Sequence, residues 1–193
     1  FNFSVQKADK EVLDKLKQHN SVLAYHTMGS GKTLTALAAA KSLNLPLSVI
    51  GPASLRQNFE NEIKKHKLNM KVDYSTYNNP DPLPIYDQLL VFDEAHRMGR
   101  AGTKVSEIPS RYSARKKLLL TGTPIRNEPS ELIPLMKALN IPVKKNPKAF
   151  NNVFLQETET TLSLKDRVFR VEPGKVISPK NLDYLEKLLK GRV

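Results

Sequence analysis

The stretch His26-Thr27-Met28-Gly29-Ser30-Gly31-Lys32-Thr33 joins two segments of different character. Residues 22–25 before it form a short apolar run, and residues 34–43 after it are alanine-rich and typical of a helix. A strand, a glycine-bearing turn, Lys-Thr and a helix are the context of a phosphate-binding loop, because backbone N–H groups and a helix N-terminus attract anions. The sequence therefore predicts that residues 26–33 bind the phosphates of a nucleotide.

Two side chains of this loop have specific expected roles. Lys32 would reach the outer phosphates, and the hydroxyl of Thr33 would hold Mg²⁺. His26 stands where the usual pattern has glycine, but Gly29 and Gly31 remain where the backbone must come close to phosphate. The alternative is a chance Gly-Lys-Thr at a helix start, and it loses weight when the other motifs of the chain are added.

Length and composition limit the class of protein. The 193 residues are enough for one domain with a substantial core. Thirty-one basic and nineteen acidic residues give a net charge of +12, which favours a polyanionic partner, although many lysine-rich proteins are basic without one. The lack of cysteine excludes disulfides and cysteine zinc sites and is compatible with a reducing, intracellular compartment, cytoplasmic or nuclear.

The ends and apolar runs of the sequence bear on its context. No apolar run approaches the length of a bilayer span, and the chain does not open like a secretory signal, so we expect no membrane partner. The first residue is Phe1 rather than methionine. We therefore expect the chain to be part of a longer protein.

Apolar patterns predict alternating strands and helices. This alternation favours an α/β fold with a mostly parallel sheet covered by helices on both faces, whose ligands gather at the carboxyl ends of the strands. Ser54 and Gln57 are expected to form a capping box, and Pro134 is expected to cost its helix a backbone bond or to kink it. The predicted strands are 22–25, 47–50, 70–74, 88–92 and 118–120, with 153–155 and 167–171 as plausible additions; the predicted helices are 8–18, 32–43, 55–65, 132–139 and 179–190, and residues 141–150 are expected to be a loop.

A second candidate segment, Asp93-Glu94-Ala95-His96, directly follows the apolar run 88–92. A magnesium–nucleotide site needs a carboxylate from a neighbouring strand end, so Asp93 is expected to hold the metal through its water shell. Glu94 is expected to orient and deprotonate the attacking water. The alternatives are an acidic pair in an ordinary turn and, for His96, a zinc ligand, but the sequence offers no partner set at metal-binding spacing.

Further features of the sequence bear on the polyanionic partner that the net charge favours. The helix start at Ser54 is an anion site that suits a nucleic-acid phosphate, a carboxylate or water. Residues 97–117 carry seven Lys or Arg against Glu107 alone, which indicates either a solvated face or contact with nucleic acid or a second lobe. Four polar segments follow predicted strand ends, and their convergence on one sheet edge is not expected by chance: residues 26–33, 51–54, 93–96 and 121–124.

Residues 20–140 together resemble the first motor lobe of superfamily-two helicases, and most closely the Swi/Snf-type ATPases that translocate on double-stranded DNA. The extended Thr-Gly-Thr-Pro motif at residue 121 points to this branch, because Asp-Glu-Ala-His boxes occur in many helicases. The matching segments are 26–34, 51–55 with Phe59 and Glu62, 93–97, and 119–127 with Glu131 and Leu132.

The resemblance implies a RecA-like P-loop NTPase fold that binds ATP and Mg²⁺. It implies catalytic roles for Lys32, Asp93 and Glu94, with Thr33 and Asp93 at the metal. Gln6 would contact adenine. The residues that would couple nucleotide state to DNA are His96, Thr121, Gly122 and Thr123, and those that would contact the DNA backbone are Pro52, Ala53, Ser54 and Arg56.

The resemblance also implies a domain plan. We expect residues 1–145 to form the lobe and residues 146–193 to extend it toward a second RecA-like lobe outside this chain. The second lobe of the family supplies an arginine finger, which is worth several powers of ten in rate. The chain alone is therefore expected to bind ATP weakly and to hydrolyse it slowly.

Four other functions compete with a DNA-translocating lobe. An RNA helicase or a restriction-type translocase would use the same lobe. A non-catalytic nucleic-acid-binding module with a relic ATP site is disfavoured by the intact candidate residues Lys32, Thr33, Asp93 and Glu94. A P-loop kinase is disfavoured because the sequence supplies no recognisable lid or phospho-acceptor site.

Overall fold

The computed structural model describes residues 7–25, 31–78, 87–99, 103–112, 114–122, 129–143, 146–157 and 175–177. The α-helices are α1 Lys7–Gln18, α2 Lys32–Leu43, α3 Leu55–Lys65, α4 Ile108–Arg111, α5 Leu132–Ala138 and α6 Pro147–Phe154. The strands are β1 Ser21–Tyr25, β2 Leu47–Gly51, β3 Val72–Thr76, β4 Leu89–Phe92, β5 Lys116–Thr121, β6 Leu155–Glu157 and β7 Lys175–Ile177. Three 3₁₀ helices are η1 Ala95–Met98, η2 Val105–Glu107 and η3 Pro129–Glu131.

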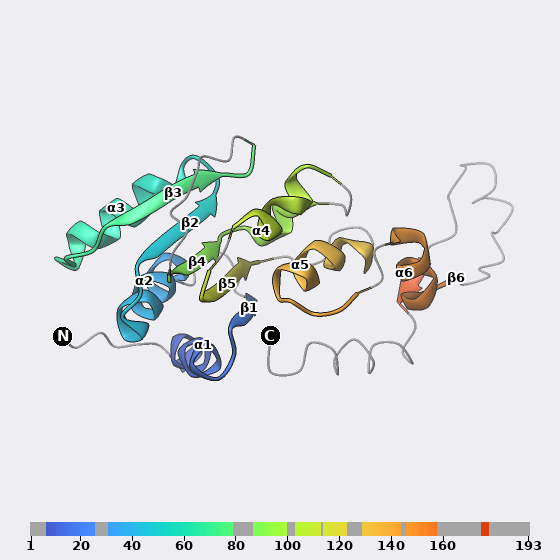
Figure 1. The fold of residues 1–193 in the computed structure, drawn as a ribbon, viewed down its shortest axis with the longest axis horizontal. Coiled ribbons are helices and arrows are strands. Elements are labelled where there is room, and N and C mark those ends of the chain that lie inside the picture. The colour runs from blue at the N-terminus through green and yellow to red at the C-terminus, as the bar shows by residue number, and fades with distance from the viewer. Residues whose placement is uncertain are drawn as a thin grey trace, which may run out of the picture.

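Strands β1 to β5 form one parallel sheet in the order β1-β5-β4-β2-β3 (Figure 1). The register pairs Tyr25 with Thr121, Phe92 with Leu119 and Ile50 with Phe92. Because all five strands run the same way, their carboxyl ends lie at one edge, as the sequence predicts. The predicted fold class is confirmed.

The sheet has a buried layer on each face, because alternate side chains of a strand point to opposite sides. One cluster joins β-strand residues such as Val49 and Val91 to α1, α2 and α3. The other joins Ile50, Phe92 and their neighbours to η1, α4, α5 and α6. Strands buried on both faces read as continuous apolar runs, which is why residues 88–92 were recognisable as a strand.

The capping box expected at Ser54 is not formed. Ser54 already has helical backbone angles, φ −65° and ψ −16°, and among the residues described its side chain makes no capping hydrogen bond. The Gln57 amide instead donates to Asn61 Oδ1 at 2.9 Å, one turn further along α3. Pro134 is the third residue of α5, and η3 directly precedes this helix, so the expected loss of a backbone bond or kink stays a prediction.

The expected loop at residues 141–150 and the expected strand at 153–155 are also corrected. α6 occupies Pro147–Phe154, and only Leu155 of the predicted strand belongs to β6. Asn146 Oδ1 accepts the backbone N–H groups of Lys148 and Ala149 at 3.0 and 3.3 Å. An Asn cap followed by proline is a helix-start signal, so this element was readable from the sequence.

Phe150 ties α6 to the lobe, because it is only 4% exposed and belongs to the same core cluster as α5. β6 pairs with β7 in an antiparallel ribbon. The predicted strand 167–171 and helix 179–190 lie outside the described residues. None of the described helices is both long and apolar enough to cross a bilayer.

Candidate active site

A cleft of about 650 Å³ opens at the carboxyl edge of the sheet. Gly31, Lys32 and Thr33 line it from the start of α2, and Asp93 and Glu94 line it from the end of β4. Residues about sixty positions apart in sequence thus share one cleft. A third wall comes from polar residues of α3 and the residue that follows it, which the sequence analysis did not assign to this site: Asn58, Asn61, Glu62, Lys65 and His66.

The spacing of the α3 residues explains their position and could have revealed it. Asn58, Asn61, Glu62 and Lys65 recur at helical intervals and therefore form one stripe. The opposite side of α3 is anchored by the buried side chains of Leu55 and Phe59. A stripe of polar residues on a helix beside a strand-end site indicates either that this side of the helix faces a ligand or that it faces solvent.

Gly31 sets the start of α2. Its backbone is left-handed, with φ 79° and ψ 26°, a conformation that residues with a Cβ adopt only at a cost. Its carbonyl accepts the N–H of Thr35 at 2.9 Å and the Thr35 hydroxyl at 3.2 Å. The first-turn N–H groups of α2 therefore begin beside the cleft, at Lys32 and Thr33, where a helix attracts anions.

Asp93 is the buried carboxylate of the site, with 9% of its surface exposed. Its N–H donates to the Ile50 carbonyl at 2.9 Å, and its Oδ1 accepts the N–H of Glu94 at 2.9 Å. Burial raises the pKa of Asp93, whereas the Glu94 N–H and the nearby Lys32 ammonium lower that pKa. The nearby Lys32 ammonium thus offsets part of the cost of burying this carboxylate.

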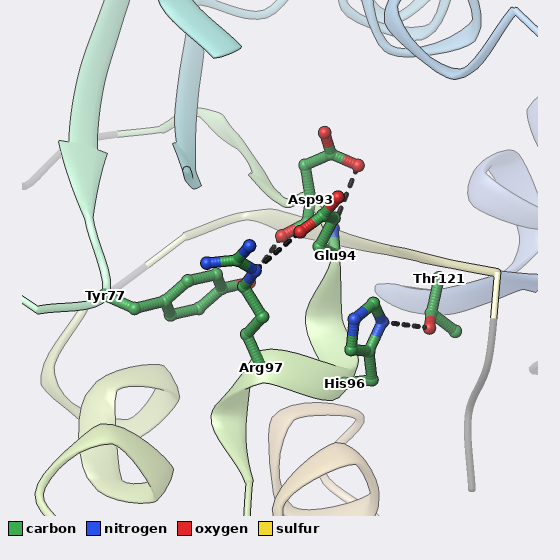
Figure 2. A network of polar contacts seen from close by, with 6 residues as sticks. All are labelled: Tyr77, Asp93, Glu94, His96, Arg97 and Thr121. Carbon is green, nitrogen blue, oxygen red and sulfur yellow. Dashed lines mark hydrogen bonds and ion pairs between the residues drawn. The ribbon is translucent and has the colours of Figure 1, made fainter. Parts of the chain in front are cut away.

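Glu94 turns the chain sharply at the end of β4. Its backbone is left-handed, with φ 48° and ψ 48°, which is uncommon for a residue with a long side chain. Its Oε2 accepts the Nε–H of Arg97 at 2.6 Å (Figure 2). Such local strain is typical of functional turns.

Tyr77 supports this turn from the end of β3, a role that the sequence analysis did not predict. Its side chain is buried, and its hydroxyl donates to the Asp93 carbonyl at 2.8 Å (Figure 2). Burial raises the pKa of Tyr77 well above 10, with the charges of Asp93 and Glu94 adding to the effect. No sequence motif marks this bond, since its two partners lie sixteen residues apart.

Replacing Tyr77 with phenylalanine is expected to lower the free energy of unfolding by about 1–2 kcal/mol, because it removes a donor from a buried carbonyl. Urea unfolding at neutral pH measures this change. The raised pKa of Tyr77 favours the neutral phenol in the folded state, so its contribution is present below the unfolded pKa of 10 and is lost as pH rises above it. The Tyr77→Phe variant should therefore lose less stability between neutral and strongly alkaline pH than the wild type.

Burial also raises the pKa of Tyr74, to about 12. The Tyr77→Phe variant should therefore still lose part of its free energy of unfolding at alkaline pH. If the variant and the wild type lost the same free energy of unfolding at alkaline pH, the loss could not be assigned to Tyr77.

His96 and Thr121 meet across the site. The Nδ1 of His96, on η1, lies 2.9 Å from Oγ1 of Thr121, at the end of β5 (Figure 2). Thr121 is fully buried, so this contact links the two strand-end motifs through the core side of the site. Two residues that the sequence resemblance assigns to coupling are thus brought together. Gly122 follows directly in the described chain, whereas Thr123 lies outside it.

The candidate DNA-contacting residues sit at the neighbouring strand end. Pro52 follows β2 and its carbonyl accepts the N–H of Leu55 at 3.0 Å, while Ala53 and Ser54 are exposed. A Cβ on Gly51 would lie 2.6 Å from a Leu55 methyl and 3.4 Å from the Asp93 Cβ, so this strand end approaches the β4 end closely.

Arg56 is the fourth of these residues, and it lies on the exposed side of α3. Its Nε donates to Glu60 Oε1 at 2.9 Å, and its guanidinium lies 5.6 Å from the centre of the Tyr74 ring. The Glu60 contact raises the pKa of Arg56, so the guanidinium stays charged.

Six predicted site residues besides Thr123 lie outside the described part of the chain. They are the candidate adenine contact Gln6 and the first five residues of the loop, His26, Thr27, Met28, Gly29 and Ser30. Among the described residues, no three of His, Cys, Asp or Glu gather as a metal-binding group, so the zinc alternative for His96 gains no support there.

Comparison with solved structures shows the fold. The chain is similar to the SWI2/SNF2 ATPase core of Sulfolobus solfataricus in complex with dsDNA, with a TM-score of 0.68 and 20% sequence identity. This match covers 98% of the present chain and 43% of that chain. The RecA-like architecture expected from the resemblance is therefore that of an SNF2 ATPase core.

Comparison with known sequences gives relatives of similar kind. A protein of Acanthamoeba polyphaga mimivirus named as an ATP-dependent RNA helicase is 27% identical over 165 residues, covering 79% of this chain. The human SWI/SNF-related matrix-associated actin-dependent regulator of chromatin subfamily A member 1 is 27% identical over 171 residues, covering 70% of this chain. The chain spans only 37% and 16% of the length of these two relatives.

A family model decides the classification. The model of the SNF2-related domain matches residues 85–190, which is more than half of the chain and includes the Asp93-Glu94-Ala95-His96 segment. The chain therefore belongs to the SNF2-related domain family.

Proposed function

We propose that this chain is the first motor lobe of an intracellular SNF2-type ATPase, which couples ATP hydrolysis to translocation on double-stranded DNA. The observation that carries the proposal is the shared cleft: Lys32 and Thr33 lie opposite Asp93 and Glu94 at one sheet edge. A phosphate-binding helix start and two carboxylates from a neighbouring strand end are the parts that nucleotide hydrolysis requires.

ATP would bind with its phosphates at the start of α2. The first-turn N–H groups and the Lys32 ammonium supply positive charge. Thr33 would supply an oxygen ligand to Mg²⁺, and Asp93 would hold the metal through its water shell. The burial of Asp93 fits a cation site, because a carboxylate with 9% exposure is otherwise costly. When bound, Mg²⁺ neutralises charge on the phosphates. The Asn58 and Asn61 amides on α3 face the same cleft and can donate to phosphate oxygens.

Glu94 is the proposed general base. The oxygen of a water attacks the γ-phosphorus, the bond from this phosphorus to the bridging oxygen breaks, and ADP leaves with that oxygen. Glu94 accepts the proton that the water loses. Lys32 stabilises the negative charge that develops on the phosphoryl oxygens. In this arrangement Asp93 would hold Mg²⁺, and Glu94 accepts the proton of the attacking water.

The site as described is half of the proposed pocket. We propose that residues 1–145 form the lobe, that residues 146–193 extend it, and that a second RecA-like lobe supplies an arginine finger. Relatives that are much longer than this chain support this plan. On its own the chain would bind ATP weakly and turn it over slowly.

Duplex DNA is the proposed track. The net charge of +12 and the exposed residues at the start of α3 support a polyanion at the same sheet edge. The solved SWI2/SNF2 core in complex with dsDNA also supports DNA for this chain. RNA is the second candidate, because one relative is named as an RNA helicase.

A nucleic-acid comparison tests this proposal. The ATPase rate of the protein that carries this chain should rise with duplex DNA more than with single-stranded DNA or RNA. The apparent DNA affinity should fall steeply with salt and vary little with sequence, because phosphate contacts dominate. Stimulation by RNA in preference to duplex DNA would reject the DNA track, and a salt-insensitive affinity would reject backbone-driven binding.

The contact between His96 and Thr121 is the proposed link between the nucleotide and the DNA. Replacing Thr121 with valine removes the hydroxyl at 2.9 Å from the imidazole. The ratio of the ATPase rates with and without duplex DNA should fall at least about fivefold, because a coupling contact is lost.

A buried hydroxyl elsewhere gives the control. Ser21 on β1 donates to the Leu139 carbonyl at 2.7 Å and is as buried as Thr121. Ser21→Ala should lower stability and leave the stimulation ratio unchanged. Equal ratios for Thr121→Val and wild type would remove the coupling role from this contact.

A further inference from the structure

We propose that Arg97 is a positioning residue that fixes the Glu94 carboxylate for proton transfer from the attacking water. This inference rests on the proposed ATPase function and deepens it, since the resemblance assigns Arg97 no role.

Arg97 contacts Glu94 twice. Its Nε donates to Glu94 Oε2 at 2.6 Å, and its backbone N–H donates to the Glu94 carbonyl at 2.8 Å. Figure 2 shows the Arg97 side chain reaching from η1 back toward the Glu94 carboxylate. The backbone contact thus holds the Glu94 main chain, and the side-chain contact holds the Glu94 carboxylate.

Glu94 needs such a partner because of its neighbour. Asp93 is buried and adjacent, and the two carboxylates repel each other across the turn. A long glutamate side chain that is 36% exposed could relieve this repulsion by rotating into solvent. The guanidinium of Arg97 is planar and offers its N–H donors to Glu94 in a fixed geometry. It therefore opposes both the repulsion and the rotation.

A purely structural role does not account for the pair. Both side chains are substantially exposed, at 52% for Arg97 and 36% for Glu94, and exposed ion pairs add little to stability. Arg97 is also not among the described residues that line the cleft, whereas Glu94 is. Within the described part of the chain, Arg97 therefore reaches the cleft only through its contact with Glu94.

The test uses steady-state ATPase kinetics of the complete protein at saturating duplex DNA. Arg97→Ala should lower kcat about tenfold or more and change KM for ATP by less than about twofold, because only the base is displaced. Arg97→Lys restores a cation at the same position and should recover most of the lost kcat. Recovery by lysine also shows that the alanine effect is not a failure to fold.

A control and a double variant sharpen the result. Glu11→Gln breaks another local ion pair, 3.0 Å from Glu11 to Lys15 on α1, and should leave kcat and KM unchanged. In a Glu94→Gln background, Arg97→Ala should have no further effect, because the group that it positions is already removed.

The outcomes separate this inference from the proposed function. If Glu94→Gln abolishes hydrolysis but Arg97→Ala keeps the wild-type kcat, the positioning role is wrong and the ATPase proposal stands. An Arg97→Ala variant that changes KM alone, or that still lowers the rate tenfold in the Glu94→Gln background, also overturns the positioning role. If Glu94→Gln itself retains the wild-type rate, the proposed function fails and this inference fails with it.

Discussion

Replacing Glu94 with glutamine is expected to lower the DNA-stimulated ATPase rate of the complete protein by about a thousandfold, because the proposed general base is removed. ATP affinity should change little, since Glu94 handles the proton of water and Asp93 holds the cation. Single-turnover hydrolysis and equilibrium binding of a fluorescent ATP analogue measure the two effects separately. Glutamine keeps the size of the side chain, so the left-handed turn at this position is preserved.

Glu107 offers a matched control for this variant. Like Glu94, it forms an ion pair with a basic side chain, because Lys137 Nζ lies 3.0 Å from Glu107 Oε1. Unlike Glu94, it is not among the described residues lining the cleft. Glu107→Gln should keep the wild-type rate. A Glu94→Gln protein with an unchanged rate would contradict the catalytic assignment and would favour a nucleic-acid-binding module with a relic site.

Replacing Lys32 with alanine is expected to weaken ATP binding by about 10- to 100-fold, because a charge-assisted bond to phosphate is lost. Hydrolysis should fall as well, since Lys32 also stabilises charge in the transition state. Calorimetric titration with ATP and steady-state kinetics measure the two effects. The variant thus differs from Glu94→Gln, which should leave binding intact.

Lys41 is the control for this effect, because it lies in the last turn of the same helix, far along α2 from the cleft. Lys41→Ala should bind ATP like the wild type. Equal ATP affinity in the Lys32→Ala and Lys41→Ala proteins would show that the start of α2 is not the phosphate site.

The central part of the fold was predictable from sequence for a physical reason. Strands buried on both faces are mostly apolar along their length, so residues 47–50, 88–92 and 118–120 stand out despite Ser48 and Gln88. Their parallel order brings the following polar segments to one edge, and this places Thr33, Asp93 and Thr121 near one another without any knowledge of distances.

The missed features depend on contacts distant in sequence or on competition between local bonds. The role of Tyr77 was not predictable, because the acceptor of its hydrogen bond is a backbone carbonyl that carries no sequence signal. The predicted capping box at Ser54 is not formed, because the Gln57 side chain is hydrogen-bonded to Asn61 instead. By contrast, the Asn146 cap of α6 and the Glu94–Arg97 pair are local, so the residue types at neighbouring helical positions indicate them.

Triple-helix displacement tests the proposed motor activity most directly. A third DNA strand is bound to a duplex, and its release by the complete protein is followed in time. We expect release that requires ATP and that is abolished in the Glu94→Gln variant, because movement along the duplex is driven by hydrolysis at this site. Duplex-stimulated ATP hydrolysis without any release of the third strand would contradict translocation on double-stranded DNA.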